Sequence, residues 1–231
     1  NTIAVTFCEA YNTKLKFGIT AFAMNECQRF LRDSVPYDPD SIFDYKWTNN
    51  TFVGGAIHKH SGANVRYHVE GKVCVVGYKI GEFDVHGKLQ THFNAGKYPM
   101  YISARAYAKS ETPNWYLQHF QSNHVCWEND FGFTYRFLGG ATISYPTKWV
   151  KARLDFSFEN QTHPIYVSAT DWKPRQYSGN VQIITGDVGV DVTTPWVNLE
   201  NRAVIQHSTN DSVMAVPLVI LQHRLYYHGT W

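Results

Sequence analysis

The sequence predicts a mainly β chain with one or a few helices, folded as a compact antiparallel β-sandwich that forms a single domain over residues 1–231. Two observations predict this class. Apolar and polar residues alternate in many segments, and glycine and proline separate these segments from one another. No internal repeat, low-complexity tract or Ser/Gly-rich linker divides the chain. A chain of 231 residues is long enough to bury a core of its own.

The N-terminal part predicts two strands and then a helix. Residues 2–11 alternate apolar with small or polar residues, and residues 14–19 repeat this pattern. Over residues 20–32 the apolar side chains lie three and four positions apart, which is typical of a helix with one apolar face. Thr20 is the expected N-cap, and Pro36 prevents continuation. We expect this helix to pack onto the sheet through Phe22, Met24, Cys27 and Leu31.

Strand patterns dominate the rest of the chain, after an extended Pro- and Asp-rich segment at residues 34–50. A hairpin is expected around Glu70-Gly71, a turn at residues 85–87, and a tight turn at Gly139-Gly140. The clearest alternation runs over residues 150–158, where apolar positions face charged and small ones. Further strands are expected at residues 98–108, 180–184 and 213–227.

The composition favours a protein that packs against other molecules over an enzyme. The chain has 15 Tyr, 14 Phe and 7 Trp, but only 17% of its residues are charged, and its net charge is +2. This balance argues against a general nucleic-acid binder, which carries a basic face. No G-x-S-x-G motif is present, and Asp155 and Glu159 lie about 13 Å apart if they share a strand. We therefore expect no catalytic residues.

Histidine-containing segments are the strongest candidates for a ligand site. His58-x-His60 and His124-x-Cys126 place two ligand-type side chains on one face of a strand, whereas zinc needs about four. With 11 His in the chain, chance pairs are expected, so we expect no metal. The glycine-rich residues 54–63 fit either an anion site or, preferably, a structural loop. No cofactor is expected to be required.

The four cysteines and the apolar runs bear on the compartment. The cysteines are scattered, which favours reduced thiols over two disulfides. Three sequons, at Asn49, Asn160 and Asn210, fit a secreted protein or chance. No run approaches the ~20 apolar residues of a spanning helix, and no secretory apolar segment is seen at the start. The sequence therefore predicts no membrane partner.

Several short motifs follow one another along the first two-thirds of the chain. Lys16-Phe-Gly-Ile-Thr20 precedes the expected helix, which ends near Phe30-Leu-Arg32, and a Tyr/Asp-containing stretch follows at residues 37–45. Gly54-Gly55-Ala56 and Lys59-His60-Ser61-Gly62-Ala63 then lead into an apolar strand at residues 73–76, and Gly132-Phe-Thr-Tyr-Arg136 comes later. In this order the motifs resemble the cypovirus polyhedrins, which crystallise inside infected insect cells and embed virus particles.

This resemblance implies a structural protein rather than an enzyme. It implies homotrimers that build a crystal lattice in occlusion bodies in the cytoplasm of the infected host cell, with virus particles as partners and no specific nucleic acid or membrane. Some family members hold nucleotides in the lattice, but no binding residue can be matched here. The alternatives are a secreted or virion-surface carbohydrate-binding β-sandwich, supported by the sequons and the Trp content, and a capsid jelly-roll protein.

An occlusion crystal must dissolve in an alkaline gut, which suggests tyrosine ionisation as the switch. Tyr37, Tyr45, Tyr226 and Tyr227 are the candidate residues for lattice contacts and for alkaline release, because they lie in segments expected to reach neighbouring molecules.

Overall fold

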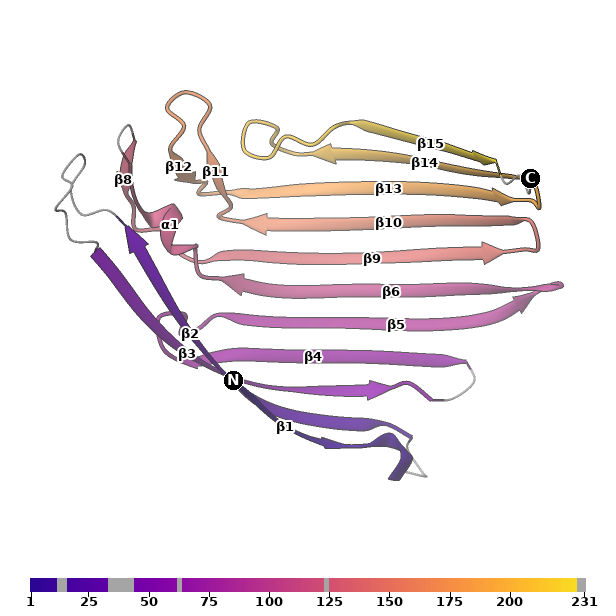
Figure 1. Ribbon diagram of the computed structural model, residues 1–231, viewed down its shortest axis with the longest axis horizontal. Helices are drawn as coiled ribbons and strands as arrows, with labels where there is room; N and C mark the ends of the chain where they lie inside the picture. Colours follow the sequence, from indigo (N-terminus) through magenta and orange to yellow (C-terminus); the bar gives the residue numbers. More distant parts are fainter. Residues whose placement is uncertain (12–15, 33–43, 62–63, 123–124, 228–231) are drawn as a thin grey trace.

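The chain forms one curved sheet of eleven antiparallel strands. The computed structural model describes residues 1–11, 16–32, 44–61, 64–122 and 125–227. Each strand of the sheet lies beside its neighbours in chain order (Figure 1). The strands are β1 (Thr2–Phe7), β2 (Gly18–Arg32), β3 (Asp44–Lys59), β4 (Val65–Val76), β5 (Phe83–Ala95), β6 (Tyr98–Glu111), β9 (Thr134–Pro146), β10 (Val150–Thr162), β13 (Asn180–Thr193), β14 (Val197–Ser208) and β15 (Val219–Tyr227).

Short elements occupy the connections between these strands. A 3₁₀ turn, η1 (Glu9–Tyr11), follows β1. Between β6 and β9 lie a one-turn helix, α1 (Trp115–Gln118), and the pair β7 (His119–Gln121) and β8 (Cys126–Glu128). Between β10 and β13 lies the pair β11 (Ile165–Val167) and β12 (Pro174–Gln176).

The segment expected to be the principal helix is a strand. Residues 20–32 belong to β2, which pairs with β3 from Gly18 opposite His58 to Arg32 opposite Asp44. The sequence of this segment fits the strand period of two as well as the helical spacing of three and four, because Phe22, Met24 and Glu26 lie on one face of the strand. Helix propensity is a weak preference that tertiary pairing overrides. The expected packing of Leu31 into a core is also wrong, since this side chain is exposed.

Three expected turns are interior parts of strands. Glu70-Gly71 lies within β4, residues 85–87 lie within β5, and Gly139-Gly140 lies within β9. Glycine inside a strand marks close approach of a neighbouring group. A Cβ at Gly54 of β3, for example, would lie 2.5 Å from Cζ of Phe22 on β2. The strands are therefore much longer than the sequence reading allowed, and most of β2–β14 have 12 to 16 residues.

The β4–β5 turn does use glycine for its backbone. Gly77 has φ +117°, and a Cβ there would lie 2.1 Å from the carbonyl oxygen of Asn49. The side-chain Oδ1 of Asn50 accepts a hydrogen bond from the backbone N–H of Lys79, at 3.0 Å. These contacts hold the turn against Asn49 and Asn50 of β3.

The prediction of a mainly β chain with little helix is confirmed, but the prediction of a compact sandwich is wrong. No second sheet covers either face of the eleven strands in the part of the chain that the structure describes. A sandwich buries a core between two layers. Here, apart from three buried prolines, the buried hydrophobic side chains among the described residues are Phe52, Ala56, Cys74, Trp115, Val181, Ile183 and Val204.

Candidate functional site: the polar face of the sheet

One face of the sheet is apolar across all eleven strands. The pairing register places Leu154 beside Ile143 and Val188, and Val188 beside Ala203. Most of these side chains are exposed. This apolar face includes Ile3, Val5, Phe7, Ile19, Val53, Ile57, Val69, Val73, Val85, Leu89, Phe93, Ile102, Phe137, Ile143, Leu154, Phe156, Ile184, Val188, Val190, Leu199, Ile205, Val219, Leu221 and Leu225. Soluble monomers rarely expose a contiguous apolar patch above a few hundred Å², so this face requires an apolar environment.

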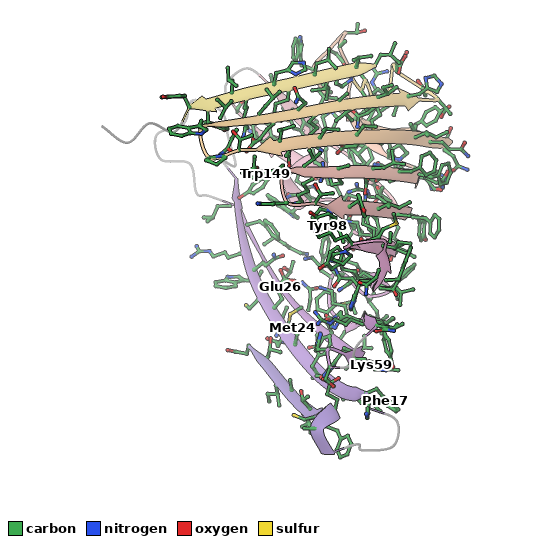
Figure 2. All side chains as sticks on the ribbon, turned by 90° about the vertical axis from the view of Figure 1, so that its right-hand side faces the viewer. Phe17, Met24, Glu26, Lys59, Tyr98 and Trp149 are labelled. Carbon is green, nitrogen blue, oxygen red and sulfur yellow. The ribbon has the colours of Figure 1, made fainter. Side chains whose placement is uncertain are left out.

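The opposite face carries ionisable side chains on the alternate residues, and we call it the polar face. Figure 2 shows the sheet as a single curved layer with side chains projecting from both sides. Strand pleating alone produces this separation, because successive side chains point to opposite faces. On β10 the residues between Leu154, Phe156 and Phe158 are Asp155 and Ser157.

The first ion-pair network of the polar face is centred on Asp155. The guanidinium group of Arg105, on β6, donates two hydrogen bonds to the Asp155 carboxylate, at 2.6 and 2.8 Å, and a third to Oγ1 of Thr142, at 3.1 Å. The Thr142 hydroxyl also donates to Asp155. Gly140 leaves room for this arrangement, because a Cβ there would lie 3.2 Å from Cζ of Arg105. The network ties β6, β9 and β10 together.

A second pair of networks flanks the first. The Asp187 carboxylate accepts hydrogen bonds from Arg153, at 3.0 Å, and from Arg202, at 2.5 and 2.9 Å. The Glu159 carboxylate accepts from Arg136, at 2.6 and 2.9 Å, with Tyr107 and Gln161 also donating to it. Charged side chains of both signs are thus held on this face by partners on neighbouring strands.

The segment that carries α1 folds over the polar face at one end of the sheet. The Trp115 ring stacks on Phe30 of β2, with ring centroids 5.4 Å apart, and only 5% of Trp115 is exposed. Nε2 of Gln118 donates to the hydroxyl of Tyr78, in the β4–β5 turn, at 2.8 Å. Nζ of Lys79, in the same turn, lies 3.1 Å from the Glu26 carboxylate on β2. A cavity remains below α1, lined by Gln28, Thr112, Arg136 and Gln161 among others.

The two ends of the sheet differ in their connections. At the end that we call the turn end, residues 96–97, 147–149 and 194–196 make short turns, and the longer connection between β1 and β2 contains η1. At the opposite loop end, residues 77–82, 112–133, 163–179 and 209–218 make longer connections, which contain α1 and the short strand pairs (Figure 1). The connections at the loop end are therefore mostly longer than those at the turn end.

Aromatic side chains gather at both ends. At the turn end Tyr98 and Tyr145 meet edge to face, and the Nζ of Lys148 lies 4.6 Å from the ring centre of Trp149. Trp149 is labelled beside the turn end in Figure 2. At the loop end Tyr135 packs near Phe133, and the Arg29 guanidinium lies over Trp47. Aromatic rings at the two ends of membrane-spanning segments, with basic side chains beside them, are typical of the membrane–water boundary.

Tyr78 provides a pH-dependent contact outside the long strands. Burial raises the pKa of Tyr78 above its ordinary value of about 10, although the hydrogen bond from Gln118 lowers it. The neutral phenol is the form that the folded site prefers. The stability gained by burying this phenol is therefore present below pH ~10 and is lost as pH rises through the raised pKa.

We expect Tyr78 to ionise above pH ~10. Its tyrosinate absorbance is the part of the wild-type signal that Tyr78→Phe lacks. The measurement is the difference between the alkaline titrations of the wild type and the variant. A wild-type minus Tyr78→Phe difference that titrates at or below pH ~10 would contradict the expected burial effect.

The structure does not bring the four tyrosines predicted as lattice and alkaline-switch residues together. Tyr37 lies outside the described residues. Tyr45 is at the start of β3, opposite Leu31, whereas Tyr226 and Tyr227 end β15 at the far side of the sheet. Tyr226 and Tyr227 are on opposite faces of that strand, and their role stays untested. His124 also lies outside the described residues, and all four cysteines are free.

Comparison with known proteins agrees with these two faces. The whole chain, residues 1–231, matches the model of a family described as "Putative porin". Among solved structures it is similar to the copper transporter OprC, with a TM-score of 0.59 and 10% identity over 92% of this chain. The chain spans 38% of the length of that transporter. No curated protein matches it. The described residues include no helix long and apolar enough to cross a membrane.

These matches overturn the resemblance to polyhedrins. The motifs that carried it have other roles: Gly54-Gly55-Ala56 is interior to β3, and Phe30-Leu-Arg32 ends a strand rather than a helix. An occlusion-body matrix protein with embedded virus particles, in the cytoplasm of an infected cell, is therefore wrong. So are the alternatives of a carbohydrate-binding sandwich and a capsid jelly roll, and so is the expectation of no membrane partner. That expectation considered only continuous apolar runs, whereas the membrane-facing signal alternates.

Proposed function

The chain belongs to this porin family, and from that premise we propose that its sheet forms part of the wall of a water-filled channel through a bacterial outer membrane. One observation carries the proposal: eleven antiparallel strands present an exposed apolar face and a charged, hydrogen-bonded opposite face. In lipid, the apolar face meets hydrocarbon, and the polar face lines the aqueous lumen.

The dimensions of the strands support this orientation. A strand tilted by about 45° needs about 9–11 residues to cross the hydrocarbon core. Nine of the eleven strands, from β2 to β14, have at least 12. Outer-membrane barrels have short periplasmic turns and long extracellular loops. We therefore place the turn end at the periplasm and the loop end outside the cell.

The wall must close, because unpaired backbone groups do not persist in hydrocarbon. Within the described residues β1 and β15 each pair on one side only. Bacterial single-chain barrels have even strand numbers, so we propose that further strands complete the wall between these two edges.

The lumen wall suits small polar solutes of either charge. Arg105, Asp155, Asp187 and Arg202 lie on neighbouring strands as compensated pairs rather than as a field of one sign. The segment with α1 lies over this wall at the loop end and is the proposed constriction. The expectation that the protein is not an enzyme stays a prediction, as does the single domain over residues 1–231.

Conductance tests the proposal directly. We expect the purified protein, with the further strands that close the wall, to give stepwise increases in current that are linear with voltage after reconstitution into planar phospholipid bilayers in KCl. Material purified identically from cells that lack the gene is the control.

Membrane fractionation provides the second readout. The protein should sediment with the outer membrane and resist extraction by alkaline carbonate. Protein that inserts into vesicles, as shown by protection of its strands from protease, yet conducts no ions would overturn the channel while leaving the membrane location intact.

A further inference from the structure

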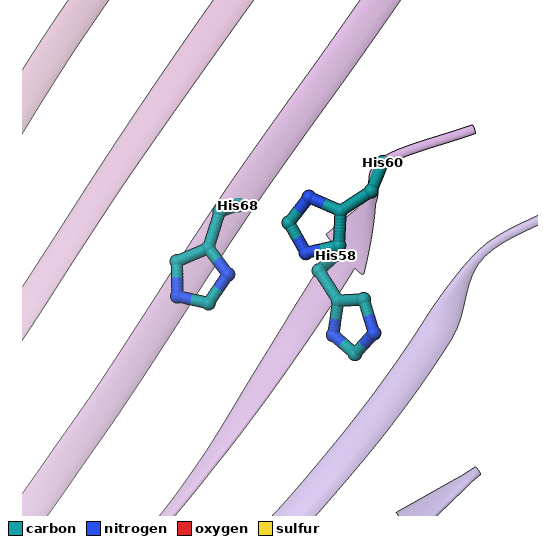
Figure 3. Close-up of side chains that lie close together, drawn as sticks. All are labelled: His58, His60 and His68. Carbon is teal, nitrogen blue, oxygen red and sulfur yellow. The ribbon is translucent and has the colours of Figure 1, made fainter. Parts of the chain in front are cut away.

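Three histidines meet on the polar face near the turn end. His58 lies on β3, His68 lies opposite it on β4, and His60 follows the end of β3 (Figure 3). The ring centroids are 4.9 Å apart for His58 and His60, 6.3 Å for His58 and His68, and 6.2 Å for His60 and His68. One imidazole nitrogen from each ring lies within 4.8 Å of the other two.

The fold makes room for this cluster. Gly18 of β2 pairs with His58, and a Cβ at position 18 would lie 2.4 Å from Nε2 of His58. Any other residue at position 18 would therefore displace the imidazole ring. His60 is fixed at its backbone, because its N–H donates to the Glu9 carboxylate of η1, at 2.9 Å. Gly18 thus leaves space for the His58 ring, and the Glu9 contact fixes the backbone that carries His60.

Carboxylates stand behind the cluster. Nε2 of His68 lies 3.3 Å from the Glu70 carboxylate, on the same face of β4. His86 on β5 lies beyond Glu70, and Nδ1 of His86 lies 3.5 Å from the Asp84 carboxylate. Histidines that ligate metals commonly donate their second ring N–H to such a carboxylate, which orients the ring and increases its basicity.

We propose that His58, His60 and His68 bind one divalent transition-metal ion of the Cu²⁺ or Zn²⁺ class. Imidazole nitrogen is a preferred ligand for both ions. Ligand nitrogens around a tetrahedral ion lie roughly 3.3 Å apart, at metal–nitrogen distances of about 2.0–2.1 Å. Side-chain rotations close the remaining gap, and the partly exposed cluster leaves the fourth position for water. Sequence alone pairs only His58 with His60, and the strand register adds the third ligand.

This site goes beyond the channel proposal and does not depend on it. An ion held at the turn end faces the lumen, so a metal ion that enters the pore meets three imidazoles at that point of the wall. Binding should release protons, because only neutral imidazole ligates a metal.

Titration of the purified full chain tests the site. With Zn²⁺ as the probe in isothermal titration calorimetry, we expect one ion per chain. His68→Ala and His58→Ala should each weaken binding at least about tenfold. With Cu²⁺ as the probe, electron paramagnetic resonance should show superhyperfine splitting from ring nitrogens.

Matched variants keep the result interpretable. His92→Ala removes a histidine from the polar face of β5 that contacts Tyr101 instead of the cluster, and it should bind as the wild type does. His86→Ala should also bind normally. Circular dichroism of each variant verifies that the sheet forms.

The proposal is overturned by wild-type protein that binds neither ion, or by folded His68→Ala that binds as tightly as the wild type. Weaker binding by His86→Ala together with normal binding by His58→Ala would also overturn it, because the ligands would then be His68, Glu70 and His86. Loss of conductance with retained Zn²⁺ binding would affect only the channel.

Discussion

Replacing Val188 by lysine is expected to lower the free energy of unfolding in phospholipid vesicles by about 2–4 kcal/mol. Val188 lies near the middle of β13, between Leu154 and Ala203 on the apolar face, and 48% of it is exposed. In water an exposed lysine at this position would cost almost nothing. In lipid the lysine ammonium group must lose its hydration or deform the bilayer around it. The size of the loss in unfolding free energy therefore shows whether this face contacts lipid or water.

Thr185→Lys is the matched control. Thr185 and Val188 share strand β13 and have nearly the same size, but Thr185 lies on the polar face, where Gln206 donates to its hydroxyl at 3.3 Å. Its substitution should change the stability by less than about 1 kcal/mol. The measurement is urea unfolding followed by tryptophan fluorescence. Equal destabilisation by the two lysines would show that the apolar face does not contact lipid.

Replacing Asp187 by alanine should destabilise the sheet by about 2–3 kcal/mol and shift its ion preference towards anions. The side chain of Asp187 is only 7% exposed and holds both Arg153 and Arg202. Removal of a buried partner costs ~3–5 kcal/mol, but the two arginine side chains are 40% and 49% exposed, and solvation by water reduces the loss. The two guanidinium groups left without their carboxylate add positive charge to the wall.

Asp191→Ala separates the network from the loss of a carboxylate. Asp191 is four residues further along the same face of β13, and among the described residues it forms no ion pair. We expect a stability change below about 0.5 kcal/mol. Reversal potentials in a KCl gradient measure the ion preference. If Asp187→Ala and Asp191→Ala have equal stability and equal selectivity, the Arg153–Asp187–Arg202 network does not stabilise the wall.

Alternation could be read from the sequence, but the extent of each strand could not. The strand over residues 150–158 was predicted with the correct faces, and it lies within β10. Glycine misled the reading at Gly71, Gly87, Gly139 and Gly140, because a glycine that admits a neighbouring strand looks like a glycine that turns the chain. Many short strands separated by turns are typical of two sheets that pack around a core, so the sequence predicted a sandwich.

Periodicity shows which residues share a face of the sheet, but it does not show what that face contacts. The pattern of Leu154 and Phe156 against Asp155 and Ser157 is the same whether the apolar side meets another sheet or lipid. What distinguishes the two is that every strand has an apolar side, and no second sheet formed by the described residues covers it. The charged partners of Asp155 and Asp187 come from β6, β10 and β14, at separations of 15 to 50 residues, so these networks could not be found without the strand register.

Pairing only between successive strands also shapes how the sheet can assemble. Every strand finds its partners immediately before and after it in the sheet's chain order, so hairpins such as β9–β10 and β13–β14 close over the short turns 147–149 and 194–196. Closing a short loop costs little chain entropy, and such local contacts favour rapid folding. Growth can thus proceed one hairpin at a time, each new strand using the previous edge as its template. The unpaired backbone groups of the edge strands β1 and β15 can pair with other chains until the last strands join. These two edges are therefore where a chaperone would be needed most.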